Sequence, residues 1–269
     1  MAFSADGYFA RIGWSGARTP AFDTLAGVLR AHMSAVHWEN LDVLLGRPVK
    51  IDLDSIYDKL VVARRGGYCY EQSTLLAAAL AHIGFAPVAH AARVVYNRPR
   101  AEAARTHMFL TVALDGTTYV LDPGYGGFGP LVPMPLAADA VFRDGRDAYR
   151  FLLNGREWTL EAQIDGSWAP LWISTLEPEP QIDFVMANHY TSTHPTSRFT
   201  AMLLLRALTP DGTRVTVANR DVRIARDGVF EQRRLADRRE LRTLLAEHFG
   251  IDLPEVERMR VPAIPEWDS

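Results

Sequence analysis

The sequence predicts an α+β protein in which a helical N-terminal part precedes a central antiparallel β-barrel and a smaller C-terminal α/β part. Helical spacing of apolar residues dominates the first third, strand spacing begins at Pro87, and hairpin dipeptides recur after that point. A parallel sheet would need helical crossovers between its strands, and that region shows none. With 269 residues, 48% of them hydrophobic, the chain is long enough for one large core or two to three coupled subdomains.

Three helices are expected in the first third of the chain. The first begins at Thr19-Pro20, where a capping hydroxyl precedes a proline at the first helical position. A second, short helix begins at Asp54-Ser55. A third follows Cys69 and is rich in alanine and leucine, which are strong helix formers. It ends at Gly84, a residue typical of helix C-caps.

The middle of the chain is expected to form consecutive antiparallel strands. These cover residues 88–95, 108–114, 117–121, 149–153, 158–164 and 169–174. Hairpin dipeptides, which tolerate the positive φ angles of tight turns, stand between several of these strands and recur later. They are Asp115-Gly116, Asn154-Gly155, Asp165-Gly166, Asp211-Gly212 and Asp227-Gly228.

The last part of the chain contains both strand and helix patterns. Residues 188–198 are polar and are expected to form a connector, with strands to follow near 201–208 and 214–218. A final helix before Gly250 places four apolar residues on one face, namely Leu241, Leu244, Leu245 and Phe249. The expected domains are therefore a helical domain at 1–86, a barrel domain at 87–190, and an interdomain segment with an α/β part at 191–269.

Charge and composition narrow the function classes. A net charge of -3 favours neither nucleic acid nor an anionic membrane as a partner, and basic residues at 233–239 are interleaved with acids. Residues 1–11 lack a secretory signal pattern, and no apolar run is long enough to cross a bilayer. A single cysteine excludes an intrachain disulfide and a cysteine zinc cage, so a reducing cytoplasm is expected.

That cysteine, Cys69, stands where a nucleophile would be useful. Gly66 and Gly67 allow a sharp backbone turn before it, and the alanine-rich helix begins at it. The free N–H groups and the dipole of a helix N-terminus favour a thiolate over a thiol, and they are suited to stabilising an oxyanion. The alternative is a small buried hydrophobic residue, and composition alone does not decide between the two.

A thiolate nucleophile needs a base and an orienting carboxylate, for which His107 and Asp122 are the candidates. If Asp115-Gly116 forms a two-residue loop, Phe109 faces Asp122, and His107 lies diagonally from Asp122 on the same face. A three-residue loop would put the two on opposite faces. Each residue alone also suits a structural role, but together with Cys69 they predict a catalytic triad.

These segments resemble the arylamine N-acetyltransferase family. The resemblance rests on an Arg-Gly-Gly-aromatic-Cys-aromatic-Glu segment, an upstream Glu-Asn-Leu-Asp, a Thr-His-Met strand start, a strand ending in Asp before a glycine loop, and an interdomain signature. They occupy residues 65–71, 39–42, 106–108, 119–129 and 188–199. With these segments in the order and spacing of the family, the resemblance covers roughly residues 5–250. The resemblance implies a helical domain, a β-barrel and an α/β lid, with a cysteine-peptidase-like arrangement of the triad.

The resemblance also implies a function and its residues. Cys69 would be the acetylated nucleophile, His107 its base and later acid, and Asp122 the orienting group. Acetyl-CoA would be the acyl donor, and an aromatic amine, hydrazine or N-hydroxyarylamine the acceptor, in ping-pong order, as in xenobiotic metabolism. Substrate-binding residues would be Tyr68, Gly124, Gly126, Gly127, Phe128 and Phe199. No metal is expected, because His189 and His194 have no third ligand nearby.

The sequence departs from the family pattern at three places, none of them in the triad. His37-Trp38, Gln72-Ser73 and Pro123 replace the usual residues, which bears on acceptor specificity more than on reaction type. Three alternatives stay open: an amide synthase using a carrier-bound acyl chain, a Cys-His-Asp hydrolase, and a non-catalytic binding scaffold. The physiological acceptor, the acyl-chain preference and the oligomeric state are not determined by the sequence.

Overall fold

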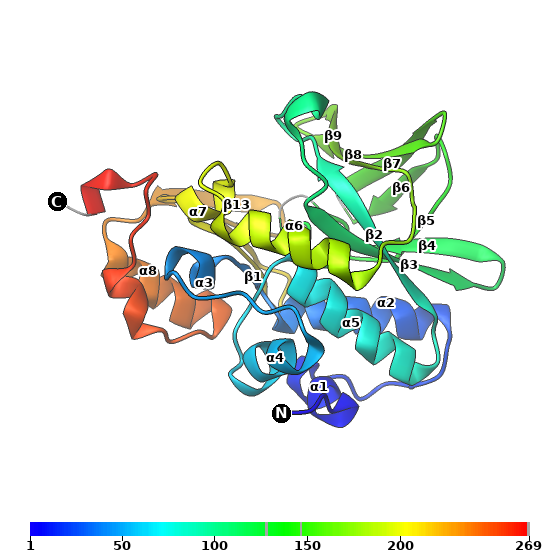
Figure 1. The fold of residues 1–269 in the computed structure, drawn as a ribbon, viewed down its shortest axis with the longest axis horizontal. Helices are drawn as coiled ribbons and strands as arrows, with labels where there is room; N and C mark the ends of the chain where they lie inside the picture. The colour runs from blue at the N-terminus through cyan, green and yellow to red at the C-terminus, as the bar shows by residue number, and fades with distance from the viewer. Residues whose placement is uncertain (127–128, 146, 268–269) are drawn as a thin grey trace. The chain divides into compact units, whose positions relative to one another are not determined.

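The computed structural model describes residues 1–126, 129–145 and 147–267 (Figure 1). The backbone divides into two compact units that are each assembled from separate stretches of chain. One unit, called unit 1, contains Met1–Gly13, Met33–Tyr68 and Asn188–Ser269. The other, called unit 2, contains Trp14–His32 and Cys69–Ala187.

Unit 2 is built on a sheet of eight strands within the described residues, and the sheet curls into a nearly closed barrel. All neighbouring strands are antiparallel, in the order β5-β4-β3-β2-β9-β8-β7-β6. The strands are β2 (Pro87–Val94), β3 (His107–Leu114), β4 (Thr117–Leu121), β5 (Met134–Pro135), β6 (Val141–Asp144), β7 (Asp147–Asn154), β8 (Glu157–Ile164) and β9 (Ser167–Ser174). The expected antiparallel β architecture of the middle part is confirmed.

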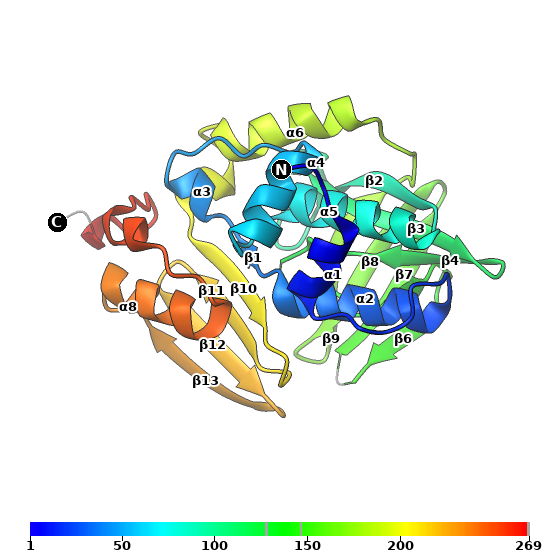
Figure 2. The ribbon, with the colours of Figure 1, turned by 90° about the horizontal axis from the view of Figure 1, so that it is seen from below.

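One face of this sheet carries α5 (Cys69–Ile83), which packs on β2 and β3 (Figure 2). Its expected end is confirmed, since Gly84 has φ +106°. On the other face Phe109, Phe151 and Trp172 form part of the buried barrel core. Because both faces of β3 are covered, its first six residues are all buried and apolar residues occupy both faces of the strand. Burial of each large side chain contributes about 1.5–3 kcal/mol.

The turn between β3 and β4 decides the register of the candidate site. Asp115 and Gly116 both have positive φ, 49° and 77°, as a two-residue type I′ turn requires. Leu114 accordingly pairs with Thr117. The two-residue loop expected from the sequence is therefore confirmed, and with it the face on which each strand residue lies.

Unit 1 contains a second antiparallel sheet, in the order β1-β10-β11-β12-β13. Its strands are β1 (Trp38–Glu39), β10 (Leu204–Leu208), β11 (Arg214–Ala218), β12 (Asp221–Arg226) and β13 (Val229–Arg234). The main helices are α1 (Ala5–Ile12), α3 (Leu41–Leu44), α4 (Leu53–Tyr57), α7 (Arg198–Ala201) and α8 (Arg238–Leu244). The apolar face expected on the last helix is buried in the core of this unit, through α8 and the π-helical turn Leu245–Phe249.

Two further helices, α2 (Phe22–Ala35) and α6 (Gln181–Thr193), contain residues of both units. The expected helix is present, but its expected start is wrong: α2 begins at Phe22, so Thr19 is not its cap and Pro20 precedes the helix. The connector expected at residues 188–198 is wrong, because α6 and α7 occupy most of it. In unit 1 the Asn188 side chain accepts from the Tyr68 hydroxyl and donates to the Val49 carbonyl at 2.9 Å.

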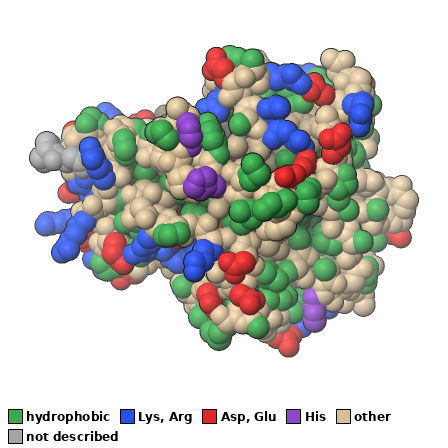
Figure 3. Space-filling model, viewed as in Figure 1, with side chains coloured by type: hydrophobic (Ala, Val, Ile, Leu, Met, Phe, Trp, Pro, Cys, Tyr) green, Lys and Arg blue, Asp and Glu red, His purple; other side chains and the backbone are tan. Residues whose placement is uncertain are grey.

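The pattern of α6 explains why it does not signal a helix. Ile182, Val185 and Met186 lie exposed, at 62%, 43% and 68%, and Figure 3 shows hydrophobic side chains gathered over this helix. Polar Asn188 and Thr191 are buried instead. An apolar stripe facing inward, the usual sign of a surface helix, is therefore missing. Among the described helices none is long and apolar enough to span a membrane.

Candidate active site

His107 and Asp122 meet inside unit 2. His107 is the first residue of β3, and Asp122 directly follows β4, whose pairing with β3 ends at Leu110 opposite Leu121. The two side chains therefore lie diagonally on one face, and Nε2 of His107 is 3.0 Å from Oδ2 of Asp122. Both side chains are buried, and Asp122 is 0% exposed. A buried carboxylate facing an imidazole fixes the tautomer with hydrogen on Nε2.

Cys69, the first residue of α5, completes this group. Its sulfur lies 3.9 Å from the carbonyl oxygen of Thr106, and the thiol lies near enough to His107 to raise the pKa of that ring. Because Nε2 faces Asp122, the ring nitrogen available to the sulfur is Nδ1. Ser73, one turn further along α5, donates to the Met108 carbonyl at 3.1 Å. This bond fastens the helix to β3 and so sets the position of the sulfur beside the ring.

The surroundings of His107 favour its protonated form. Burial lowers the pKa of His107, but the Asp122 carboxylate and the neighbouring Cys69 raise this pKa to about 10. The opposite charge of Asp122 thus outweighs the cost of desolvating the imidazolium. At neutral pH the ring holds its proton.

The glycine loop after Asp122 lies against the cysteine. A Cβ on Gly124 would stand 2.3 Å from the Cys69 Cα and 2.6 Å from its Cβ, so only glycine fits. Gly126 has φ +68°, a left-handed conformation that also favours glycine. The Tyr125 ring meets the His107 ring edge-on, with centroids 5.7 Å apart. Gly127 and Phe128, expected to bind substrate, lie outside the described residues.

One residue of this site has no signal in the local sequence. The indole Nε1–H of Trp172, on β9, donates to Oδ2 of Asp122 at 2.9 Å. The sequence predicts a strand at 169–174 but does not indicate which other strand pairs with it. β9 pairs with β2, which places Val94 opposite Trp172 and Ala92 opposite His107. Only the long-range pairing of the sheet therefore brings this tryptophan to the carboxylate.

In unit 1 the segment that precedes the cysteine is held by a buried ion-pair group. Arg65 Nη2 lies 2.8 Å from Oε1 of Glu39 and 3.1 Å from Oδ1 of Asp42, and Lys59 lies 2.8 Å from Asp42. Burial opposes the ionisation of Asp42, but Lys59 and Arg65 hold its pKa below the usual value. Gly66 passes so close to His37 that a Cβ would be 2.3 Å from the His37 carbonyl oxygen.

The other expected substrate residues of unit 1 lie together. The rings of Tyr68 and Phe199 are 5.4 Å apart, and Trp38 lies 5.6 Å from Phe199. Asn40, from the Glu-Asn-Leu-Asp motif, donates to the carbonyls of Phe199 and Met202 at 3.0 and 2.8 Å. It also accepts from the Leu204 N–H at 2.9 Å. The motif therefore holds the chain around Phe199 in place.

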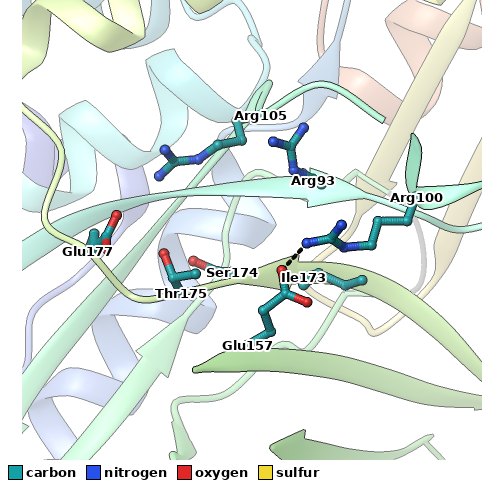
Figure 4. A pocket seen from close by; sticks show the side chains of 8 residues that line it. All are labelled: Arg93, Arg100, Arg105, Glu157, Ile173, Ser174, Thr175 and Glu177. Carbon is teal, nitrogen blue, oxygen red and sulfur yellow. Dashed lines mark hydrogen bonds and ion pairs between the residues drawn. The ribbon is translucent and has the colours of Figure 1, made fainter. Parts of the chain in front are cut away.

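A polar cavity of about 180 Å³ lies elsewhere in unit 2, and Figure 4 shows the side chains that line it. Arg93 and Ile173 line it from paired positions of β2 and β9, one residue along from Val94 and Trp172. Neighbouring strand residues point to opposite faces, so this cavity lies on the face away from Trp172. Two of its arginines pair with carboxylates, Arg100 with Glu157 and Arg105 with Glu179. Within the described residues there is no cluster of three potential metal ligands.

Comparisons with known proteins were made for the whole chain. A family model described as N-acetyltransferase matches residues 21–258. The chain is 37% identical over 268 residues to an arylamine N-acetyltransferase of Mycolicibacterium smegmatis, covering 98% of this chain and 97% of that protein. A crystal structure of the M. smegmatis enzyme in variant form has a TM-score of 0.90 at 35% identity, covering 97% and 99%. The Mycobacterium marinum enzyme in complex with CoA has a TM-score of 0.89 at 34% identity, covering 94% of each chain.

Proposed function

The chain belongs to the arylamine N-acetyltransferase family and is an acetyltransferase, and we propose that it uses Cys69, His107 and Asp122 as a catalytic triad. In this proposal acetyl-CoA acetylates Cys69, and the thioester then passes its acetyl group to an aromatic amine, hydrazine or N-hydroxyarylamine. One observation carries the proposal: Cys69, His107 and Asp122 are buried together, with His107 Nε2 3.0 Å from Asp122 Oδ2 and Cys69 near enough to raise the pKa of the ring. The M. marinum relative that binds CoA supports the choice of donor.

The first half-reaction exchanges one thioester for another. The Cys69 thiolate attacks the acetyl carbonyl, the new C–S bond forms, and the bond between the acetyl carbon and the CoA sulfur breaks. The leaving CoA thiolate takes the proton from Nδ1 of His107. Asp122 accepts a hydrogen bond from the remaining ring N–H, on Nε2, and holds the ring in this orientation. Because the broken and formed bonds are of one type, this step is close to an even exchange.

The second half-reaction needs His107 as a base, which the first step has left neutral. The acceptor nitrogen attacks the thioester carbon, and His107 Nδ1 takes a proton from that nitrogen. The C–S bond to Cys69 then breaks and returns the thiolate beside an imidazolium. During both steps negative charge forms on the carbonyl oxygen. The backbone N–H groups in the first turn of α5, where Cys69 stands, are the proposed donors to it.

The proposed acceptor class is compatible with the aromatic side chains expected at the site. Aromatic amines are neutral at pH 7 and need no charged partner, so apolar walls suit them. Tyr68 and Phe199, with Gly124, Gly126, Gly127 and Phe128, are proposed as contacts for the substrates. Several expectations from the sequence remain predictions. They are a cytoplasmic location, a role in xenobiotic metabolism, an α/β lid, a cysteine-peptidase-like arrangement of the triad, and domains at 1–86, 87–190 and 191–269.

Intact-mass measurement after mixing the protein with acetyl-CoA alone tests the proposal. One acetyl group on Cys69, mapped to its peptide and removed by adding an arylamine, is expected. A Cys69→Ala variant should acquire no acetyl group. Absence of both the acetyl group and CoA release in the wild type would refute the acetyl-CoA reaction and favour a carrier-borne acyl donor. Rapid loss of the acetyl group to water without an amine would favour a hydrolase.

A further inference from the structure

Trp172 contacts Asp122 of the candidate active site at the same carboxylate oxygen as His107. The residue is fully buried on β9, and its Nε1–H donates to Oδ2 of Asp122 at 2.9 Å. His107 Nε2 lies 3.0 Å from the same oxygen. Oδ2 therefore accepts hydrogen bonds from side chains of two different strands.

The indole has little freedom to move. Phe109 stacks on Trp172 with ring centroids 4.4 Å apart and planes inclined by 23°. Phe109 also lies nearly parallel to His107, with ring centroids 6.4 Å apart and planes inclined by 17°. The sheet brings these rings near one another, because β2 places Ala92 opposite His107 and Val94 opposite Trp172. The donor N–H is thus fixed by packing as well as by its acceptor.

We propose that Trp172 is a positioning residue for acetyl transfer. Its N–H fixes the orientation of the Asp122 carboxylate, and through it the ring of His107 towards Cys69. A carboxylate turns readily about its Cβ–Cγ bond when one donor holds it, whereas two donors from different strands leave one orientation. Hydrogen bonds to a charged group are about twice as strong as neutral ones. The proposal rests on the function proposed above, since it assigns Trp172 to that reaction.

Trp172→Phe tests the proposal because it keeps an aromatic ring in the stack and removes the N–H. Trp158→Phe is the matched control. Trp158 lies on β8, packs against the same core and meets Phe151 edge-on at 6.2 Å. The rate of Cys69 alkylation by iodoacetamide, followed by intact mass from about pH 6 to about pH 10, reports on the triad without any substrate.

The expected result is a slower reaction with a displaced pH profile. Trp172→Phe should lower the alkylation rate near pH 7 by about tenfold to a hundredfold, and the rate of acetylation by acetyl-CoA by a similar factor. The acid limb should move to higher pH, because a misaligned Asp122 holds the His107 proton less firmly. The titratable groups facing His107 are Cys69 of α5, Asp122 after β4 and Tyr125 of the next loop. Trp158→Phe should leave the rate and profile unchanged.

Two outcomes would overturn the proposal. In one, folded Trp172→Phe keeps the wild-type rate and pH profile. In the other, both tryptophan variants change alike, which assigns the effect to packing of the core. If Trp172→Phe does not fold, the wild-type indole N–H resonance is followed by NMR during acetylation. It should shift when His107 loses its proton, and an unmoved resonance would also overturn the proposal.

The same measurements separate this proposal from the proposed function. If acetyl-CoA fails to acetylate wild-type Cys69 but Trp172→Phe still alters alkylation, only the assigned reaction is wrong. If acetylation occurs and neither alkylation nor acetylation depends on Trp172, only the positioning role is wrong.

Discussion

Replacing Asp122 by asparagine is expected to remove the charge that keeps His107 protonated. The Asp122 side chain is completely buried and accepts from His107 at 3.0 Å and from Trp172 at 2.9 Å. Asparagine has the same shape and one acceptor oxygen, so both donors keep a partner. It carries no charge, however, and the burial that lowers the pKa of His107 then acts with much less opposition.

The size of the effect follows from the pKa of His107, which is about 10 in the folded protein and 6.5 ordinarily. The difference of 10 − 6.5 corresponds to an upper limit of about 5 kcal/mol. Effective interactions between buried groups are weaker than such limits. A fall in Cys69 alkylation near pH 7 by about a hundredfold to a thousandfold is therefore expected. Since the folded pKa is raised, the stabilisation is complete below about pH 6.5 and is lost as pH rises through about 10.

Two measurements check this expectation. The first is the rate of alkylation by iodoacetamide near pH 7. The second is urea unfolding near pH 6 and near pH 10, where wild type should lose stability between the two pH values and Asp122→Asn should lose less. Asp115→Asn serves as the control, because Asp115 is exposed in a turn that asparagine also accepts. An Asp122→Asn variant with wild-type alkylation and the wild-type pH dependence of stability would refute the reasoning.

Two further substitutions test the packing and the ion pairs around the cysteine. Gly124→Ala places a Cβ 2.3 Å from the Cys69 Cα, so acetylation should be largely lost and urea unfolding should show a cost of about 1–3 kcal/mol. Wild-type acetylation in this variant would contradict the close approach. Arg65→Gln leaves the fully buried Glu39 without its cation and should destabilise unit 1 by about 3–5 kcal/mol in urea unfolding. The control is Arg64→Gln, which replaces an exposed arginine and should change the free energy of unfolding by less than about 0.5 kcal/mol. Equal destabilisation by the two variants would refute the role of the Arg65–Glu39 ion pair.

The β3–β4 hairpin shows how far local sequence reaches into the site. Asp115-Gly116 specifies a two-residue turn, since both residues adopt positive φ there. Side chains alternate along a strand, so the turn length alone places His107 and Asp122 on one face. The helix start at Cys69 is equally local, because its alanine and leucine residues favour a helix wherever the chain runs. The sequence was misleading at α6, where buried polar groups replace an apolar stripe.

By itself, therefore, the sequence determined the antiparallel middle part, the helix that begins at Cys69, the two-residue hairpin turn and the family to which the chain belongs. Its residues at these places act through neighbours a few positions away, so no distant contact needs to be known. Only the tertiary structure decided that Trp172 holds Asp122 and that Arg65 meets Glu39 and Asp42. These partners are 50, 26 and 23 residues apart in the chain. Strand pairing and the burial of charge bring them together, and the energies of both depend on the completed fold.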